Sequence, residues 1–387
     1  MKGDRMSRRG YGQPIGLAAL LLQTVIGGTV EAEGIAPWRS SVIGGGGWIQ
    51  NVVIAPSDPQ RLYAYVDVGG VFRSDDGGRV WRMIHHRLGN RRVRSLSVDP
   101  REANRLILVN GSPTWVQGAW VSEDGGETWR QTLRALFEGN GADRAAGFLL
   151  ARSPVNPDLI LAASVDSGVY RSVDNGESWE PIEGTEHRYP ADIRFDLFEP
   201  HRVYLACLLW QWKDRRRAPA FYRSEDEGRT FVKLSDRAPT EMVQCPAEPG
   251  RLYAIFDYAE IRVSEDGGET WREASEGLPL NPQRAREPVS EHRFSALAAG
   301  PDFLLTASTR GTFYRKNAGE AVWQRVPREG VEQKVAGEPW FNAPERRAAS
   351  DFDFFGAALG SITVCVNNPQ RWFFTDWAGI YETTDGG

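Results

Sequence analysis

The sequence is poor in the residues that bind metals. It contains five histidines and three cysteines in 387 residues. The histidines, His85, His86, His187, His201 and His292, show no metal-ligand spacing with one another or with the cysteines. We therefore predict no metal site and no cofactor. The cysteines, Cys207, Cys245 and Cys365, lie far apart in apolar runs, which favours buried thiols and leaves a Cys207 to Cys245 disulfide as the alternative.

An excess of positive charge and long apolar runs are also missing. The formal net charge at pH 7 is −5, which argues against nucleic acid or an anionic membrane as a partner. The main apolar run, residues 14–28, follows a basic start and predicts a signal peptide over 1–32 that is cleaved after Ala32. Ser7-Arg8-Arg9 also fits a twin-arginine export signal. Since the run is too short for a permanent anchor, we expect a secreted or periplasmic protein.

What the chain has in abundance is a repeat. The unit Ser-x-Asp-x-Gly-x-Thr-Trp occurs in five recognisable copies, at 74–81, 122–129, 172–179, 224–231 and 264–271. A degenerate copy ends at Trp323, and a seventh begins as TTDGG at 383. The final aromatic residues lie 40 to 52 residues apart, the period of a four-stranded propeller blade. We predict an all-β fold, a single seven-bladed β-propeller over 33–387 that the N-terminal strand around Trp38 closes.

The repeat aspartates are predicted to be structural. Serine and aspartate side chains can bond nearby backbone amides in the turn between the third and fourth strands, and the tryptophan can fill the gap between blades. This interpretation covers Asp76, Asp124, Asp174, Asp226, Asp266 and Asp385.

The candidate functional residues lie on the opposite face of the predicted propeller. Strand direction alternates within a blade, so the turns between second and third strands share a face with the connections between blades. Those turns contain Asp67, Asp166, Asp257 and Asp376, and Trp115, Trp210, Trp212, Trp340 and Trp377 lie in or beside the same loops. Rings and carboxylates together suit a polysaccharide, although Trp210 and Trp212 fit equally well as residues that pin long loops.

Longer stretches resemble the xyloglucan-active glycoside hydrolases of family seventy-four. The resemblance rests on VIGGGGWIQNVVIAPSDPQRLYAYVDVGGVFRSDDGG at 42–78, NGSPTW at 110–115, GNGADRAAG at 139–147 and residues 353–386. Members of that family have two seven-bladed propellers and hydrolyse by inversion, with one catalytic aspartate from each propeller. The resemblance implies that Asp67 is the general base, and it suggests substrate contacts at Trp115, Trp340, Trp377, Asn140 and Arg144.

This sequence departs from the family pattern because it contains one propeller. A second propeller or a protein partner would have to supply the general acid, or the acid must come from the same face. Asp376 is the leading candidate because blade seven neighbours blade one in a closed ring, with Asp351 and Asp353 as weaker ones.

Two alternatives stay open from the sequence. The first is a noncatalytic propeller that binds a glycan or a protein. The second is a sialidase, for which Arg144, Arg194 and Arg293 could be proposed, although the Arg-Ile-Pro signature is missing. Photosystem assembly factors and sortilin-type receptors use the same repeat, but they do not explain the four-glycine opening.

Overall fold

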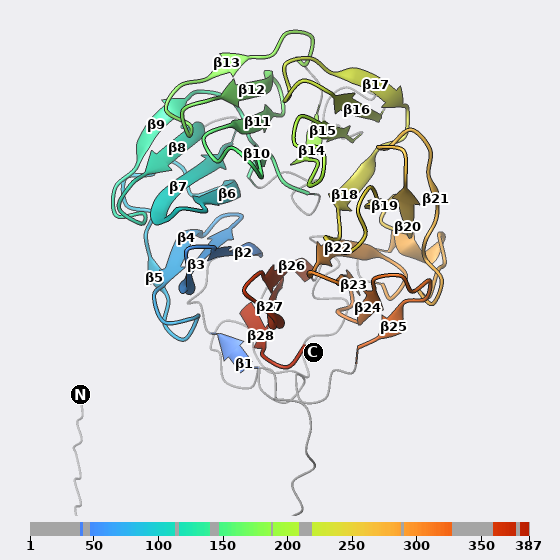
Figure 1. Cartoon of the computed structure of the whole chain (residues 1–387). Helices are drawn as coiled ribbons and strands as arrows, with labels where there is room; N and C mark the ends of the chain where they lie inside the picture. Colours follow the sequence, from blue (N-terminus) through green and yellow to red (C-terminus); the bar gives the residue numbers. More distant parts are fainter. Residues whose placement is uncertain are drawn as a thin grey trace, which may run out of the picture. The chain divides into compact units, whose positions relative to one another are not determined.

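The fold is a ring of seven β-sheets, each with four antiparallel strands (Figure 1). This arrangement confirms the predicted all-β, seven-bladed propeller. Within the parts that the structure describes, the single helical element is the 3-10 helix η1 (Arg284–Arg286). The computed structural model describes residues 39–41, 47–112, 116–139, 147–186, 189–208, 219–287, 290–326, 359–376 and 380–386.

Strands in a blade are named A to D from the propeller axis outward. Blade 1 contains β2 (Ile49–Ala55), β3 (Asp58–Val66), β4 (Gly70–Ser74) and β5 (Arg82–Met83). Blade 2 contains β6 (Val93–Asp99), β7 (Glu102–Asn110), β8 (Gly118–Ser122) and β9 (Arg130–Leu133). Blade 3 contains β10 (Leu150–Arg152), β11 (Ile160–Ser164), β12 (Gly168–Ser172) and β13 (Glu180–Pro181).

The remaining blades follow the same order. Blade 4 contains β14 (Pro190–Phe195), β15 (Val203–Cys207), β16 (Ala220–Ser224) and β17 (Val232–Ser235). Blade 5 contains β18 (Pro239–Val243), β19 (Leu252–Phe256), β20 (Glu260–Ser264) and β21 (Arg272–Glu273). Blade 6 contains β22 (Phe294–Ala299), β23 (Phe303–Ser308), β24 (Phe313–Asn317) and β25 (Gln324–Arg325).

Blade 7 combines strands from both ends of the sequence. It contains β26 (Leu359–Cys365), β27 (Asn368–Asp376), β28 (Ile380–Thr383) and β1 (Arg39–Ser41). The N-terminal strand β1 pairs antiparallel with β28, with Ser40 opposite Tyr381. Strand β2 contacts both β6 and β26, so blade 1 lies between blades 2 and 7.

The core lies between the faces of neighbouring sheets. Strands β11, β15 and β19 are buried along their whole length, as expected for strands covered on both faces. Cys207, Cys245 and Cys365 lie buried in blades 4, 5 and 7 and each remains a thiol. No helix in the described ranges is long and apolar enough to cross a bilayer.

The repeat forms the turn between strands C and D. In the fifth copy, Asp266 Oδ1 accepts hydrogen bonds from Ser264 Oγ at 2.7 Å and from the Thr270 amide at 2.9 Å. The Gly268 amide donates to Ser264 Oγ at 2.7 Å. Partial burial opposes ionisation of Asp266, but these hydrogen bonds outweigh it and lower the pKa to about 2. Equivalent serine and backbone bonds surround Asp76, Asp124, Asp174 and Asp226.

Acid should weaken the fold through these turns. Because the folded pKa of Asp266 lies below its unfolded value of about 3.9, its stabilising contribution is present above pH ~4 and is lost as the pH falls toward ~2. We expect Asp266→Asn to lose less stability than the wild type over this range in urea unfolding at a series of pH values. Asp236→Asn, at an exposed position, serves as the control. Equal losses in the wild type and Asp266→Asn would contradict the assignment.

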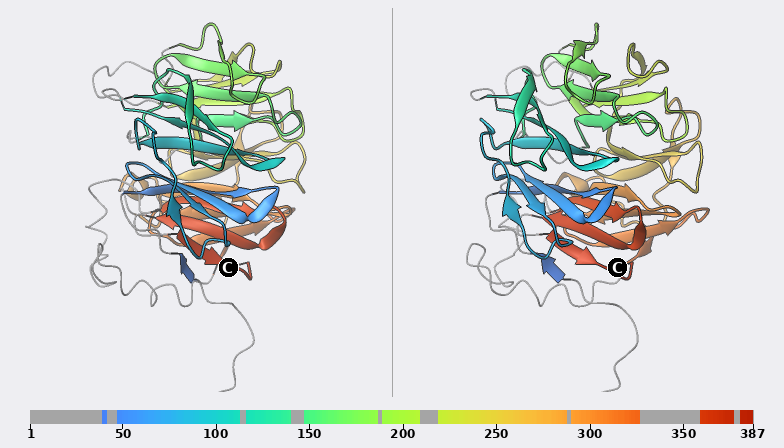
Figure 2. Two further views of the ribbon diagram at one scale, coloured as in Figure 1. Left: turned by 90° about the vertical axis from the view of Figure 1, so that its left-hand side faces the viewer. Right: turned by 60° about the vertical axis from the view of Figure 1, so that its left-hand side comes forward.

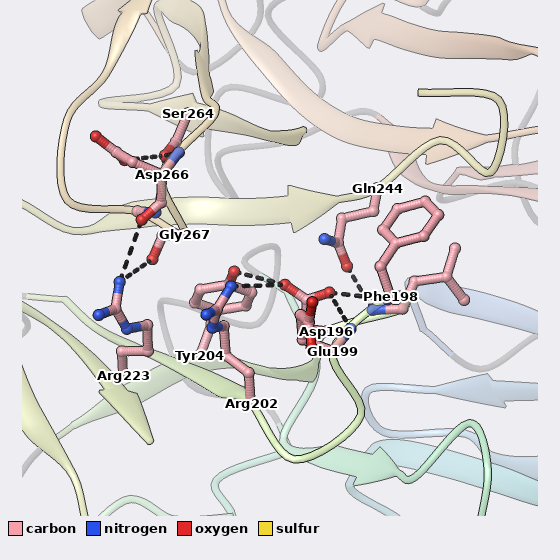
Figure 3. Close-up of polar contacts among 12 residues, drawn as sticks. Asp196, Phe198, Glu199, Arg202, Tyr204, Arg223, Gln244, Ser264, Asp266 and Gly267 are labelled. Carbon is pink, nitrogen blue, oxygen red and sulfur yellow. Dashed lines mark hydrogen bonds and ion pairs between the residues drawn. The ribbon is translucent and has the colours of Figure 1, made fainter. Parts of the chain in front are cut away.

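Arginines link several repeat turns to the blade before them. Arg223 of β16 donates to the carbonyl oxygens of Asp266 at 3.3 Å and Gly267 at 3.0 Å, in the next blade (Figure 3). In the same view, Tyr204 Oη donates to Asp196 Oδ2 at 2.7 Å and so secures the A–B turn of blade 4. The same link to the next blade is made by Arg73 to Gly125, Arg171 to Glu227 and Arg371 to Gly77.

Blade 6 replaces the repeat turn with a buried charge. The strand register places Lys316 where the other copies have serine or threonine, and Ala318 where they have aspartate. Lys316 Nζ donates to Tyr253 Oη at 3.2 Å and lies 3.8 Å from Glu248 Oε2, both in blade 5. Burial lowers the pKa of this ammonium group. The sixth copy is therefore degenerate because its side chains form a contact between blades rather than a turn.

Candidate functional site

The loops that connect the strands lie on two opposite sides of the ring, as the side views show (Figure 2). We call the side with the B–C turns and the D–A connections the B–C face. It is defined by the turns at 67–69, 165–167 and 257–259. The repeat turns lie on the other side.

Asp67 is buried at the inner end of the first B–C turn. It follows β3 directly, and the residue is only 3% exposed. Asp67 Oδ1 accepts a hydrogen bond from the Trp48 amide at 2.9 Å, and the Asp67 amide donates to the Trp48 carbonyl at 3.0 Å. The carboxylate is therefore held in one orientation against the start of β2.

The last of the four opening glycines makes room for this carboxylate. A Cβ atom on Gly47 would lie 2.4 Å from Asp67 Oδ1, and Gly47 has a φ of +142°. Both the space and the backbone conformation favour glycine. Gly47 and Asp67, which the sequence resemblance joined in one motif, thus meet in space.

The other turn aspartates differ from Asp67 in position and environment. Asp257 takes the first turn position like Asp67, but it has a φ of +54° and an ion pair with Arg237 at 2.5 Å. Asp166 takes the second position of its turn, since Ser164 pairs with Gly168. The four turn aspartates are therefore not equivalent, which alignment of the turn sequences alone had not revealed. Asp376 ends β27 with its backbone opposite Leu359, and its side chain lies outside the description.

Several predicted contact residues fall outside the described parts of the chain. They are Trp115, Asn140, Arg144, Trp340 and Trp377, together with Trp210, Trp212, Asp351 and Asp353. Arg144, one of the three arginines considered for a sialidase, is thus also outside the described residues. Of the other two, Arg194 forms an ion pair with Asp192 at 2.8 Å. Arg293 stacks on Tyr258, with 4.0 Å between its guanidinium carbon and the ring centroid. No group of three or more His, Cys, Asp or Glu side chains in the described ranges could hold a metal ion.

Sequence reasoning missed a polar cluster on the inner strands. Asp192 of β14 bridges two neighbouring blades, because Oδ1 accepts from the Phe148 amide at 2.9 Å and Oδ2 from the Met242 amide at 3.0 Å. Glu241 of β18 accepts from the Leu297 amide at 3.0 Å. β-Bulges precede both carboxylates. An acidic residue within the first, innermost strand of each of these two blades was the available signal.

Glu241 holds its proton unusually tightly. Burial raises its pKa to about 8, with Arg194 opposing the shift and Asp192 adding to it. Because the folded pKa lies above the unfolded value of about 4.3, the folded state binds the extra proton between these pH values, and stability should fall as the pH rises toward 8.

Glu241→Gln tests this proton. Glutamine keeps an acceptor for the Leu297 amide but has no carboxyl proton to lose. We therefore expect the variant to lose less stability than the wild type between about pH 5 and 9 in urea unfolding. Glu273→Gln, at an exposed position on β21, should keep the wild-type pH dependence. If Glu241→Gln kept it as well, the assigned proton would be wrong.

Together the fold and the site define a seven-bladed β-propeller with a carboxylate fixed on its B–C face. Its curated relatives include xyloglucanases, and one from Acetivibrio thermocellus is 25% identical over 94% of this chain and 50% of its own length. No protein-family model matches the chain. These relatives agree with the resemblance seen in the sequence.

Solved structures support the fold. The family 74 xyloglucanase from Xanthomonas campestris gives a TM-score of 0.66 at 20% identity, over 90% of this chain and 53% of its own. YCF48 bound to a D1 peptide gives a TM-score of 0.59 at 17% identity, over 92% of this chain and 99% of its own. The chain thus spans about half the length of the xyloglucanases it matches.

Proposed function

We propose that this propeller acts on a β-1,4-glucan or xyloglucan-type polysaccharide as an inverting endo-hydrolase. The proposal rests on one observation in particular: Asp67 is fixed by the Trp48 amide beside the four-glycine opening. Of the turn aspartates whose side chains are described, Asp166 and Asp257 have no such backbone bond. The xyloglucanase relatives supply the substrate class.

In this proposal Asp67 is the general base. It takes a proton from the water that attacks the anomeric carbon, while a protonated carboxyl gives its proton to the leaving glycosidic oxygen. Inverting enzymes place the two carboxyls about 6.5–9.5 Å apart so that water fits between them. Asp376 is the proposed acid, since it ends β27 in the blade next to blade 1. Trp115, Asn140, Arg144, Trp340 and Trp377 are the proposed substrate contacts.

A noncatalytic glycan-binding propeller is the second candidate. The observation that favours it is the 3% exposure of Asp67, because a general base must reach water. The chain also spans only about half the length of this xyloglucanase relative, and the family resemblance assigns the acid to a second propeller. A second propeller or a protein partner would then complete the site.

The deciding experiment incubates the purified protein with xyloglucan and with mixed-linkage glucans. The expected result is new reducing ends, with the inverted anomer as the first product by NMR. Glycan binding without release would favour the second candidate. Absence of both binding and release would overturn both.

We further propose that the protein is exported to the periplasm or secreted after removal of residues 1–32. N-terminal sequencing of the protein recovered from the exported fraction should begin at Glu33. Recovery of the full-length chain from the cytoplasm would contradict export.

A further inference from the structure

A pocket on the B–C face lies between blades 2 and 3. Its volume is about 420 Å³, within the range of small-ligand sites of roughly 300–1,000 Å³. Its wall is formed by Gln117 before β8, Gln131 on β9, Arg134 and Leu136 after β9, and Asp166 and Ser167 in the B–C turn of blade 3. We call it the blade 2–3 pocket.

Asp166 presents one carboxylate oxygen to this pocket. Its Oδ1 accepts from Ser164 Oγ at 2.9 Å and from Ser167 Oγ at 2.6 Å, so the turn uses a single oxygen. No cation within the described ranges pairs with Asp166, whereas Asp257 is paired with Arg237. The serine hydroxyls therefore orient a carboxylate whose second oxygen remains available. Burial, together with the negative charge of Asp166, raises the pKa of Glu138.

Two more polar groups in the pocket lack a partner within the part of the chain that is described. The Arg134 guanidinium is exposed and forms no hydrogen bond or ion pair there, and Gln117 Oε1 is buried without a donor. A buried acceptor without a partner is costly in a folded protein. An acceptor from Asp166, donors from Arg134 and an acceptor from Gln117 thus line one cavity.

The chemistry of these groups selects a neutral, hydroxyl-rich ligand. One carboxylate and one guanidinium cancel in charge, so neither a phosphate nor a metal ion is favoured. Sugar hydroxyls can donate to the carboxylate and the amide oxygen and accept from the guanidinium. Val116, 49% exposed at the edge of the pocket, and Leu136 offer apolar surface for sugar C–H groups.

We propose that the blade 2–3 pocket is an accessory saccharide subsite, which extends the polysaccharide site proposed at Asp67 and rests on that function. Asp67 and Asp166 lie on B–C turns of the same face, in blades 1 and 3. A chain long enough to reach both would gain contacts that a short oligosaccharide cannot make. The subsite therefore favours long chains over short ones.

Calorimetric titration with short and long xyloglucan oligosaccharides tests the subsite. The key variant is Asp166→Asn, because asparagine keeps an acceptor for the two serine hydroxyls but replaces the second oxygen by a donor. Asp166→Asn and Arg134→Ala should each weaken binding of the long oligosaccharide by about tenfold. Binding of the short one should change little.

Asp257→Asn is the matched control, since it changes a turn aspartate on the same face outside the pocket. It should bind both oligosaccharides like the wild type. Wild-type affinity in Asp166→Asn and Arg134→Ala, with binding and hydrolysis intact, would overturn the subsite alone. Absence of glycan binding by the wild-type protein would overturn the subsite and the proposed function together.

Discussion

Asp67→Asn is expected to lower release of reducing ends from xyloglucan by about 10²–10⁴-fold, the usual contribution of a general base. Asparagine cannot take a proton from the attacking water. Its side-chain oxygen can still accept the hydrogen bond from the Trp48 amide that Asp67 Oδ1 accepts at 2.9 Å. The melting temperature should therefore stay close to that of the wild type, so the loss would report chemistry rather than unfolding.

Two comparisons sharpen this result. Asp67→Ala also removes the acceptor for the Trp48 amide and should lower stability by about 1–3 kcal/mol as well as activity. Asp257→Asn, at the same turn position in blade 5, should keep both. If Asp67→Asn released reducing ends as fast as the wild type, Asp67 would not be the general base.

Trp323→Ala is expected to lower the free energy of unfolding by about 3–5 kcal/mol, the range for truncating a buried aromatic residue. Trp323 is 2% exposed, and its Nε1 donates to the Ala274 carbonyl at 2.7 Å across the boundary between blades 6 and 5. Alanine would leave both a cavity and a buried carbonyl without its donor. Urea unfolding followed by circular dichroism measures the change.

Trp323→Phe separates the two contributions. Phenylalanine fills most of the space but cannot donate to Ala274, so its loss should be smaller than that of alanine. Lys316 also crosses this boundary, to Tyr253 and Glu248 of blade 5. A loss below ~1 kcal/mol for Trp323→Ala would show that other contacts hold the two blades.

The number of blades could be predicted because the signal is local. Ser74, Asp76 and Gly78 satisfy one another within four residues, so the motif is visible in the sequence itself. Links between blades are not local. Arg73 bonds the Gly125 carbonyl in the next blade, and nothing next to Arg73 in the sequence indicates that partner.

The candidate site was predictable only in part for the same reason. Asp67 could be placed on the correct face from strand alternation, but its bond to Trp48 depends on the register of β2 and β3. The different turn position of Asp166 likewise needed the register of β11 and β12. Glu241 remained unnoticed because its partners, Arg194 and Leu297, belong to the two adjacent blades.

The pairing of β1 with β28 bears on how the protein is made. Residues 39–41 are synthesised long before their partners at 380–382. Until those partners are synthesised, β1 has no strand to pair with, and its edge is open to pairing with other chains. Contacts between such distant residues form slowly. Overproduction should therefore expose newly made chains to aggregation at this edge more than at any repeat turn, whose partners are translated together.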